Sequence, residues 1–157
     1  MEFIHAPVPG FDKYLRKTLE LTFGKLLKVE QPLWRNNWLI AQSGELSSAE
    51  LYDGSDENGS ARELKQPPTL ENIRNLFVKV EYQTIRRLPR SGYLLFTAKL
   101  MSDKLSSLEQ YPKAAQCLAA SIQGMSKPMR SYKGISDDIT CQAILEYLNA
   151  IEDSNRK

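Results

Sequence analysis

Apolar residues recur three and four positions apart near both ends of the chain, as they do on the buried face of a helix. Residues 11–28 follow this spacing, and the Pro9-Gly10 turn ahead of them predicts where the helix opens, with Gly24 as its one weak point. Residues 103–124 predict a short helix and then a longer one that begins at Pro112, because proline is tolerated in a first helical turn.

A last helix is predicted near the C-terminal end. Ser136, Asp137 and Asp138 mark its start, because short polar and acidic side chains favour a helix N-terminus. We expect its buried stripe to consist of Ile139, Ala143, Ile144, Leu148 and Ile151.

Alternation of apolar and polar residues marks the middle of the chain and predicts β-strands. It appears in residues 32–41, 75–89 and 93–101, and Pro89 and Gly92 supply a reversal between the last two. In the second strand Phe77, Lys79, Glu81 and Gln83 are expected to point away from Leu76, Val78, Val80 and Tyr82. In the first strand, one side is expected to carry Trp34, Trp38 and Ile40 and the other Arg35 and Asn37. In the third strand, one side is expected to carry Leu94, Phe96, Ala98 and Leu100.

The order of these elements predicts an α+β fold. Residues 43–69 are rich in Ser, Gly, Asp and Glu, which predicts a long mobile loop rather than a domain boundary. A turn or short helix follows near residues 70–75, ahead of the strand pair, which should be antiparallel. We therefore expect one domain, residues 1–157, in which helices cover one side of an antiparallel sheet.

Composition narrows the classes of function. The formal net charge of +2 is too small to indicate a nucleic-acid partner, and no stretch is apolar enough for a membrane span or a signal peptide, so we expect a cytoplasmic protein. Cys117 and Cys141 have apolar neighbours and no disulfide or zinc spacing, which predicts two reduced core residues.

Few residues are candidates for chemistry. The chain lacks a phosphate-binding glycine loop, a histidine cluster and a nucleophile elbow, and His5 is its one histidine. A single imidazole suffices to ligate haem iron, although a lone histidine near a terminus is more often an ordinary residue. Arg86 and Arg87 form a cationic group with Arg90 that suits propionates, a carboxylate or a phosphate, but a solvated strand end is the commoner interpretation. Trp34 is likewise more often core than cofactor contact.

The stretches "IHAPVPGF", "WRNNW", "VEYQTIRRLPRSGYLLFT" and "YKGI", in this order, resemble the haem-dependent oxidative N-demethylase family, also called domain of unknown function 3445 or HRQ family. The resemblance covers about residues 3 to 135. It implies a PAS-like fold that holds haem b and oxidatively demethylates a small secondary amine, with electrons from a flavin and iron–sulfur reductase partner. His5, in the "HAPVPG" element, is then the expected axial ligand and hence the metal-binding residue.

The resemblance also suggests roles for other positions. Arg86 and Arg87 would hold propionates, Trp34 and Asn37 would contact the cofactor, and Glu81 and Tyr82 would be the catalytic candidates. The family commonly has arginine where this chain has Tyr82, and only four residues precede His5 where relatives carry a longer portion. A homodimer or a partner would be one way to complete the pocket wall.

Two alternatives stay open. One is a haem-free acid/base enzyme of secondary metabolism, such as a cyclase, isomerase or dehydratase, with Glu81, His5 or Tyr82 as acid or base. The other is a non-catalytic module that binds a small molecule or a protein.

Overall fold

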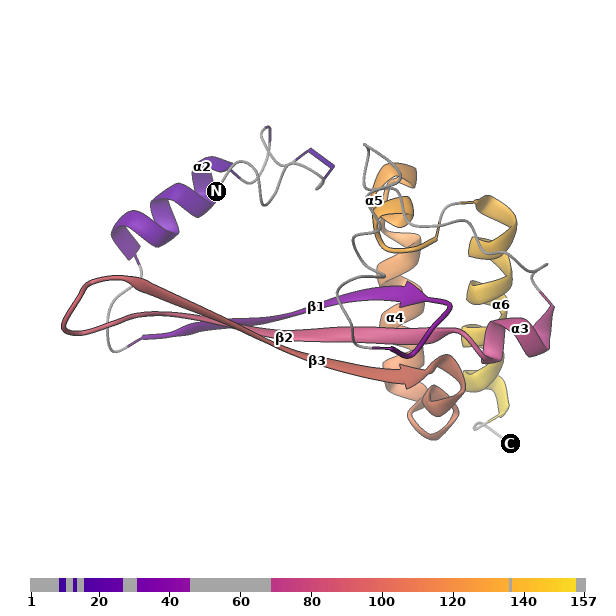
Figure 1. Cartoon of the computed structure of the whole chain (residues 1–157). Helices are drawn as coiled ribbons and strands as arrows, with labels where there is room; N and C mark the ends of the chain where they lie inside the picture. The colour runs from indigo at the N-terminus through magenta and orange to yellow at the C-terminus, as the bar shows by residue number, and fades with distance from the viewer. Residues whose placement is uncertain are drawn as a thin grey trace. The chain divides into compact units, whose positions relative to one another are not determined.

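The computed structural model describes residues 9–10, 13, 16–26, 31–45, 69–135 and 137–154. Three strands, β1 (Leu33–Ala41), β2 (Phe77–Arg87) and β3 (Leu94–Lys104), form an antiparallel sheet in the order β1-β2-β3 (Figure 1). Helices make up most of the remaining described chain, which confirms the predicted α+β class. Residues 46–68, the greater part of the loop predicted at 43–69, and the axial-ligand candidate His5 lie outside the described residues.

The described chain divides into two compact units. The first, called the ribbon unit here, comprises the described residues within 1–38 and 80–101, and the second, the helical unit, those within 39–79 and 102–157. Each of the three strands contributes residues to both units.

In the ribbon unit, the predicted first helix is seen as α2 (Arg16–Leu21), followed by a π-helical turn, η2 (Thr22–Leu26), that contains Gly24. The hydroxyl of Thr22 donates to the carbonyl of Thr18 at 2.8 Å, so this side chain competes for a carbonyl that a helix would use. The wider turn therefore begins where the sequence first weakens helical bonding.

The predicted reversal between β2 and β3 is confirmed. Leu88 N donates to Tyr93 O at 2.8 Å, and Gly92 N donates back to Leu88 O at 2.9 Å. Gly92 has a φ of 71°, a conformation that glycine adopts without steric cost. A glycine at this position therefore lets the chain turn back within five residues of the strand end.

The core of the helical unit is built by α4 (Pro112–Gln123) and α6 (Asp138–Ser154), which pack against each other. The 3₁₀ helix η3 (Leu105–Gln110) and helices α3 (Leu70–Arg74) and α5 (Lys127–Tyr132) complete the unit (Figure 1). Helix α5 was not predicted. The side chains with almost no exposure are Ile73, Leu105, Ile122, Ile135, Ile144 and Leu148.

Local sequence signals account for where these helices begin. Pro112 occupies the first turn of α4, as predicted, and Thr69 caps α3 by accepting a hydrogen bond from Asn72 N at 3.3 Å. Helix α6 is capped by Asp137, whose Oδ1 accepts from Thr140 N at 2.7 Å. Burial alone would raise the pKa of Asp137, but hydrogen bonds from Thr140 and Ile139 lower it below 3.8.

Several burial predictions are wrong. Ile139, expected in the core, is 73% exposed, and the buried side of α6 instead includes Thr140, Cys141 and Tyr147. Both cysteines are free, as predicted, but Cys117 is exposed whereas Cys141 is buried. Trp34 is 66% exposed rather than half-buried, and the apolar residues of β3 at Leu94 and Phe96 are also exposed.

In β2 the more polar side of the strand is the more buried one, contrary to what hydrophobicity predicts. Its two buried residues are the polar Lys79 and Gln83, at 3% and 8% exposure, whereas the aromatic Tyr82 is exposed. The Lys79 ammonium donates to Glu45 O at 2.5 Å, within the helical unit. A buried amine is tolerated only when its donors are bonded, and Glu45 supplies such an acceptor from a residue far along the sequence.

Candidate functional site

The pairing of the strands determines which side chains of the ribbon unit share a face. Arg35 meets Gln83 and Asn37 meets Glu81 across β1 and β2, as expected for one antiparallel register. Across β2 and β3, Leu88 bonds Tyr93 and Thr84 meets Thr97, which places Leu100 opposite Glu81 and Ala98 opposite Gln83. We call this side of the sheet, with Arg35, Asn37, Glu81, Gln83, Phe96, Ala98 and Leu100, the Glu81 face.

Four polar side chains on the Glu81 face form one continuous hydrogen-bonded line, the polar row. Arg35 Nε donates to Gln83 Oε1 at 2.8 Å, and Gln83 Nε2 donates to Glu81 Oε2 at 2.5 Å. Asn37 Nδ2 approaches the same Glu81 oxygen at 3.4 Å. Because Gln83 is buried and uses both ends of its amide, its side chain is held in one orientation.

Glu81 is the chemically versatile member of the polar row. Two amide groups converge on its Oε2, which orients the carboxylate. Among the described residues, no side chain donates to its Oε1. That oxygen can therefore accept a proton or bind an ammonium group.

An apolar strip lies beside the polar row on the same face. It consists of Phe96, Ala98 and Leu100 from β3, and Phe96 is 56% exposed. The Glu81 face thus places apolar side chains beside one carboxylate and two amides, and sites for small organic ligands combine apolar lining with a few polar groups.

The other predicted site residues of β1 and β2 do not join the polar row. Trp34 and Tyr82 lie on the opposite face, where their ring centroids are 5.9 Å apart at an interplanar angle of 33°. Arg86 shares the parity of Tyr82 and is exposed. The structure therefore brings Glu81 and Asn37 together, and separately pairs Trp34 with Tyr82.

Arg87 has a bonding pattern that the sequence did not suggest. Its guanidinium donates to Gly92 O at 2.9 Å and to Phe23 O at 2.6 Å, and so ties η2 to the hairpin turn. These contacts occupy donors that were expected to hold propionates. Arg86, by contrast, makes no hydrogen bond or ion pair with any described residue.

Residues 1–138 match the family model described as haem-dependent oxidative N-demethylase, alpha subunit-like. The chain belongs to this family. The match includes both the polar row and the "HAPVPG" element with His5, and it ends at the first residue of α6. Membership of the N-demethylase-like family carries haem dependence and amine oxidation as properties of the family as a whole.

Other features of this family member bear on its chemistry. Within the described ranges, no three side chains of His, Cys, Asp or Glu gather in a way that could hold a metal ion. A haem would need only one axial side chain, which is a different requirement from such a cluster. None of the described helices has both the length and the apolar character needed to cross a membrane.

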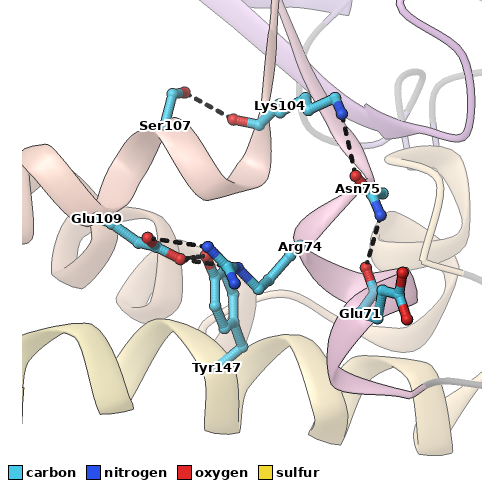
Figure 2. Close-up of polar contacts among 7 residues, drawn as sticks. All are labelled: Glu71, Arg74, Asn75, Lys104, Ser107, Glu109 and Tyr147. Atoms are coloured by element: carbon cyan, nitrogen blue, oxygen red, sulfur yellow. Dashed lines mark hydrogen bonds and ion pairs between the residues drawn. The ribbon is translucent and has the colours of Figure 1, made fainter.

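A second polar cluster, in the helical unit, was missed by sequence reasoning (Figure 2). Arg74 pairs with both carboxylate oxygens of Glu109, at 3.0 and 3.2 Å, and the Tyr147 hydroxyl donates to the same carboxylate at 2.7 Å. Desolvation, reinforced by Glu109, raises the pKa of Tyr147 to about 12. The three residues join α3, η3 and α6, and no local motif signals contacts so distant in sequence.

Beside this cluster lies a surface pocket of about 350 Å³, lined by Glu71, Arg74, Asn75 and Ser106. Most of its polar groups already have protein partners: Lys104 Nζ donates to Asn75 Oδ1 and Asn75 Nδ2 donates to Glu71 O, each at 3.0 Å (Figure 2). These bonds connect the end of β3 to α3, so the cluster is chiefly a structural link. The polar row remains the better candidate for chemistry.

Proposed function

We propose that this chain binds haem b through His5 and catalyses oxygen-dependent demethylation of a small secondary amine, giving a primary amine and formaldehyde. The oxidant is molecular oxygen, and a flavin and iron–sulfur reductase supplies the two electrons that the balance requires. The proposal is supported at the family level by the match of residues 1–138. The single structural observation that carries it is the orientation of Glu81 within the polar row beside an apolar strip.

The described residues fit a haem in character. A porphyrin needs apolar side chains against its ring, and Phe96, Ala98 and Leu100 offer such side chains on the Glu81 face. The propionates of haem need cationic partners. The guanidinium of Arg86 makes no hydrogen bond with any described residue, whereas that of Arg87 is already bonded to two carbonyl groups. We therefore assign the propionate role to Arg86 or to residues outside the described ranges, in preference to Arg87.

In this proposal the chain's own residues bind and orient the amine. When bound, the haem supplies the oxygen chemistry. A secondary amine is an ammonium at neutral pH, and the Oε1 atom of Glu81 attracts that cation and accepts the proton that must leave before nitrogen or its methyl group is oxidised. Gln83 and Asn37 position the carboxylate, and the apolar strip favours the methyl substituents.

The first test is an absorption spectrum of the purified protein before and after addition of haemin. The proposal predicts a Soret band in the unmodified protein that is lost in His5→Ala and retained in Glu146→Gln, a surface control on α6 whose only described partner is Gln142. A protein that takes up no haemin would contradict it. Haemin bound equally by His5→Ala would reject the axial-ligand assignment.

The second test separates turnover from binding. With haem, oxygen, a reductant and dimethylamine, we expect formaldehyde release that Glu81→Gln lowers at least tenfold while the Soret band is unchanged. Bound haem without amine-dependent formaldehyde would instead favour a ligand-binding module. A colourless protein whose acid/base activity depends on Glu81 would favour the haem-free enzyme.

A further inference from the structure

The outer edge of β3 is open along the ribbon unit. β3 is the last strand of the sheet, and no described residue bonds its outer side (Figure 1). Tyr93, the residue before β3, accepts a hydrogen bond from Leu88, the residue after β2, so alternate residues from 93 onward direct their backbone groups inward. The backbone N–H and C=O groups of Leu94, Phe96, Ala98 and Leu100 therefore point outward, away from β2.

This edge lacks the features that normally prevent strands from pairing. Leu94–Lys104 contains no proline, and the register of Leu88 with Tyr93 is kept at Thr84 with Thr97 and at Leu76 with Leu105, so no bulge interrupts the pair. The side chains of Leu94, Leu95, Phe96 and Met101 are exposed on it. Lys99 is the one charged residue between Leu94 and Met101.

We propose that the β3 edge binds the β3 edge of a second copy of this chain, forming an antiparallel two-fold pair centred on Ala98. In an antiparallel two-fold pair of this edge, each residue whose backbone groups point outward must face another such residue. The two-fold axis therefore passes through the position of one residue of β3, which we call the centre of the pair. A centre at Lys99 would place two lysine side chains directly opposite each other, which is unfavourable. Centres at Ala98 and at Leu100 give equally long pairings within β3 that avoid this repulsion, and only the Ala98 centre places Phe96 opposite Leu100 rather than opposite Lys104.

The pairing centred on Ala98 matches the chemistry of the facing side chains. Leu95 lies opposite Met101 of the second copy on one face, and Phe96 lies opposite the second copy's Leu100 on the other. Lys99 lies opposite Thr97, which accommodates its charge. Leu95, Phe96 and Met101 thus find apolar partners, while Leu94 lies opposite Ser102. This self-complementarity favours a second copy over a dissimilar protein.

A proline substitution tests the backbone part of this proposal. Ala98→Pro removes an outward N–H that β2 does not use, and proline is tolerated on an edge strand at such a position. In sedimentation equilibrium and light scattering of the full chain, we expect the unmodified protein to dimerise and Ala98→Pro to raise the dimer dissociation constant at least about tenfold, at unchanged thermal midpoint of the monomer. The proposal would be overturned if the unmodified protein were monomeric at every concentration, or if it formed a dimer that Ala98→Pro leaves intact.

A charge-rescue pair tests the register and does not depend on whether Ala98→Pro folds. Leu95→Lys should weaken the dimer, and adding Met101→Glu should restore it, because residues 95 and 101 are far apart within one strand and meet only across the two-fold axis. Failure of the rescue would exclude the Ala98 centre. Slow hydrogen exchange at Phe96 and Ala98 in a monomer would show another occupant on the edge and would also overturn the proposal.

Discussion

Gly134 lies directly against the backbone carbonyl of Ile40, so closely that a Cβ atom at position 134 would overlap the carbonyl oxygen. The neighbouring Lys133 accepts a hydrogen bond from Ile40 N at 2.8 Å, and Gly134 itself has a φ of 86°. The "YKGI" stretch thus holds the segment after α5 against the end of β1, within the helical unit. Only glycine meets both requirements, the close approach and the left-handed backbone.

Gly134→Ala is therefore expected to destabilise the protein strongly. The added methyl group must displace the Ile40 carbonyl and also adopt a strained φ, and together these effects should lower the free energy of unfolding by about 2 kcal/mol or more. Urea unfolding followed by circular dichroism measures the change. Gly124→Ala is the matched control, because Gly124 ends α4 at a φ of −75° with only ordinary contacts, and it should change stability by less than about 1 kcal/mol. Equal effects of the two substitutions would contradict this assignment.

The hydrogen bond from Arg35 to Gln83 predicts measurable coupling between β1 and β2. In a double-mutant cycle of Arg35→Ala and Gln83→Ala, we expect an interaction free energy of about 0.5–1.5 kcal/mol, because the bond is partly buried. The same cycle on Arg35 and Thr84, which faces the other side of the sheet, should give a value near zero. Additivity in both cycles would mean that the polar row does not hold Gln83 in place.

The elements with local signals were predictable from sequence. The hairpin at Pro89 and Gly92 and the start of α4 at Pro112 each depend on residues within one turn of the feature. Burial was less predictable because it depends on distant partners. Lys79 bonds Glu45, 34 positions away, and Arg35 bonds Gln83, 48 positions away, so alternation alone assigned the polar residues to the wrong degree of exposure.

The burial predictions that failed within helices were based on residue type and ignored the position of each residue around the helix axis. Ile139 is apolar but lies five residues before Ile144, which places it about 140° around α6 from the buried stripe. The small residues Ala115 and Ala119 are buried in α4, whereas Cys117, midway between them, faces the opposite side. In the candidate site, the sequence indicated Glu81 and Asn37, but only the strand register showed that Arg35 and Gln83 complete the same row.

The two cysteines should differ in reactivity toward a thiol-alkylating reagent. Cys117 is exposed, whereas Cys141 is buried and burial raises the pKa of its thiol, which disfavours the reactive thiolate. Iodoacetamide under native conditions should therefore modify Cys117 alone, as shown by peptide mass spectrometry. Cys117→Ser should abolish native labelling, and both sites should react in denaturant. Native labelling of Cys141 at a comparable rate would contradict the packing of α6.

Tyr147 predicts a specific loss of stability at alkaline pH. Its pKa is raised by desolvation and by Glu109 from 10.0 to about 12 in the folded protein, so between these values the unfolded chain loses a phenolic proton that the folded chain keeps. The stabilisation is complete below pH 10 and disappears as the pH rises toward 12, by up to about 3 kcal/mol for a two-unit shift. Urea unfolding at a series of alkaline pH values measures this decline, and Tyr147→Phe should flatten it while the matched variant Tyr111→Phe, at an exposed position, should leave it unchanged. The difference between the variants carries the result. Parallel curves for Tyr147→Phe and the unmodified protein would show that Tyr147 does not contribute.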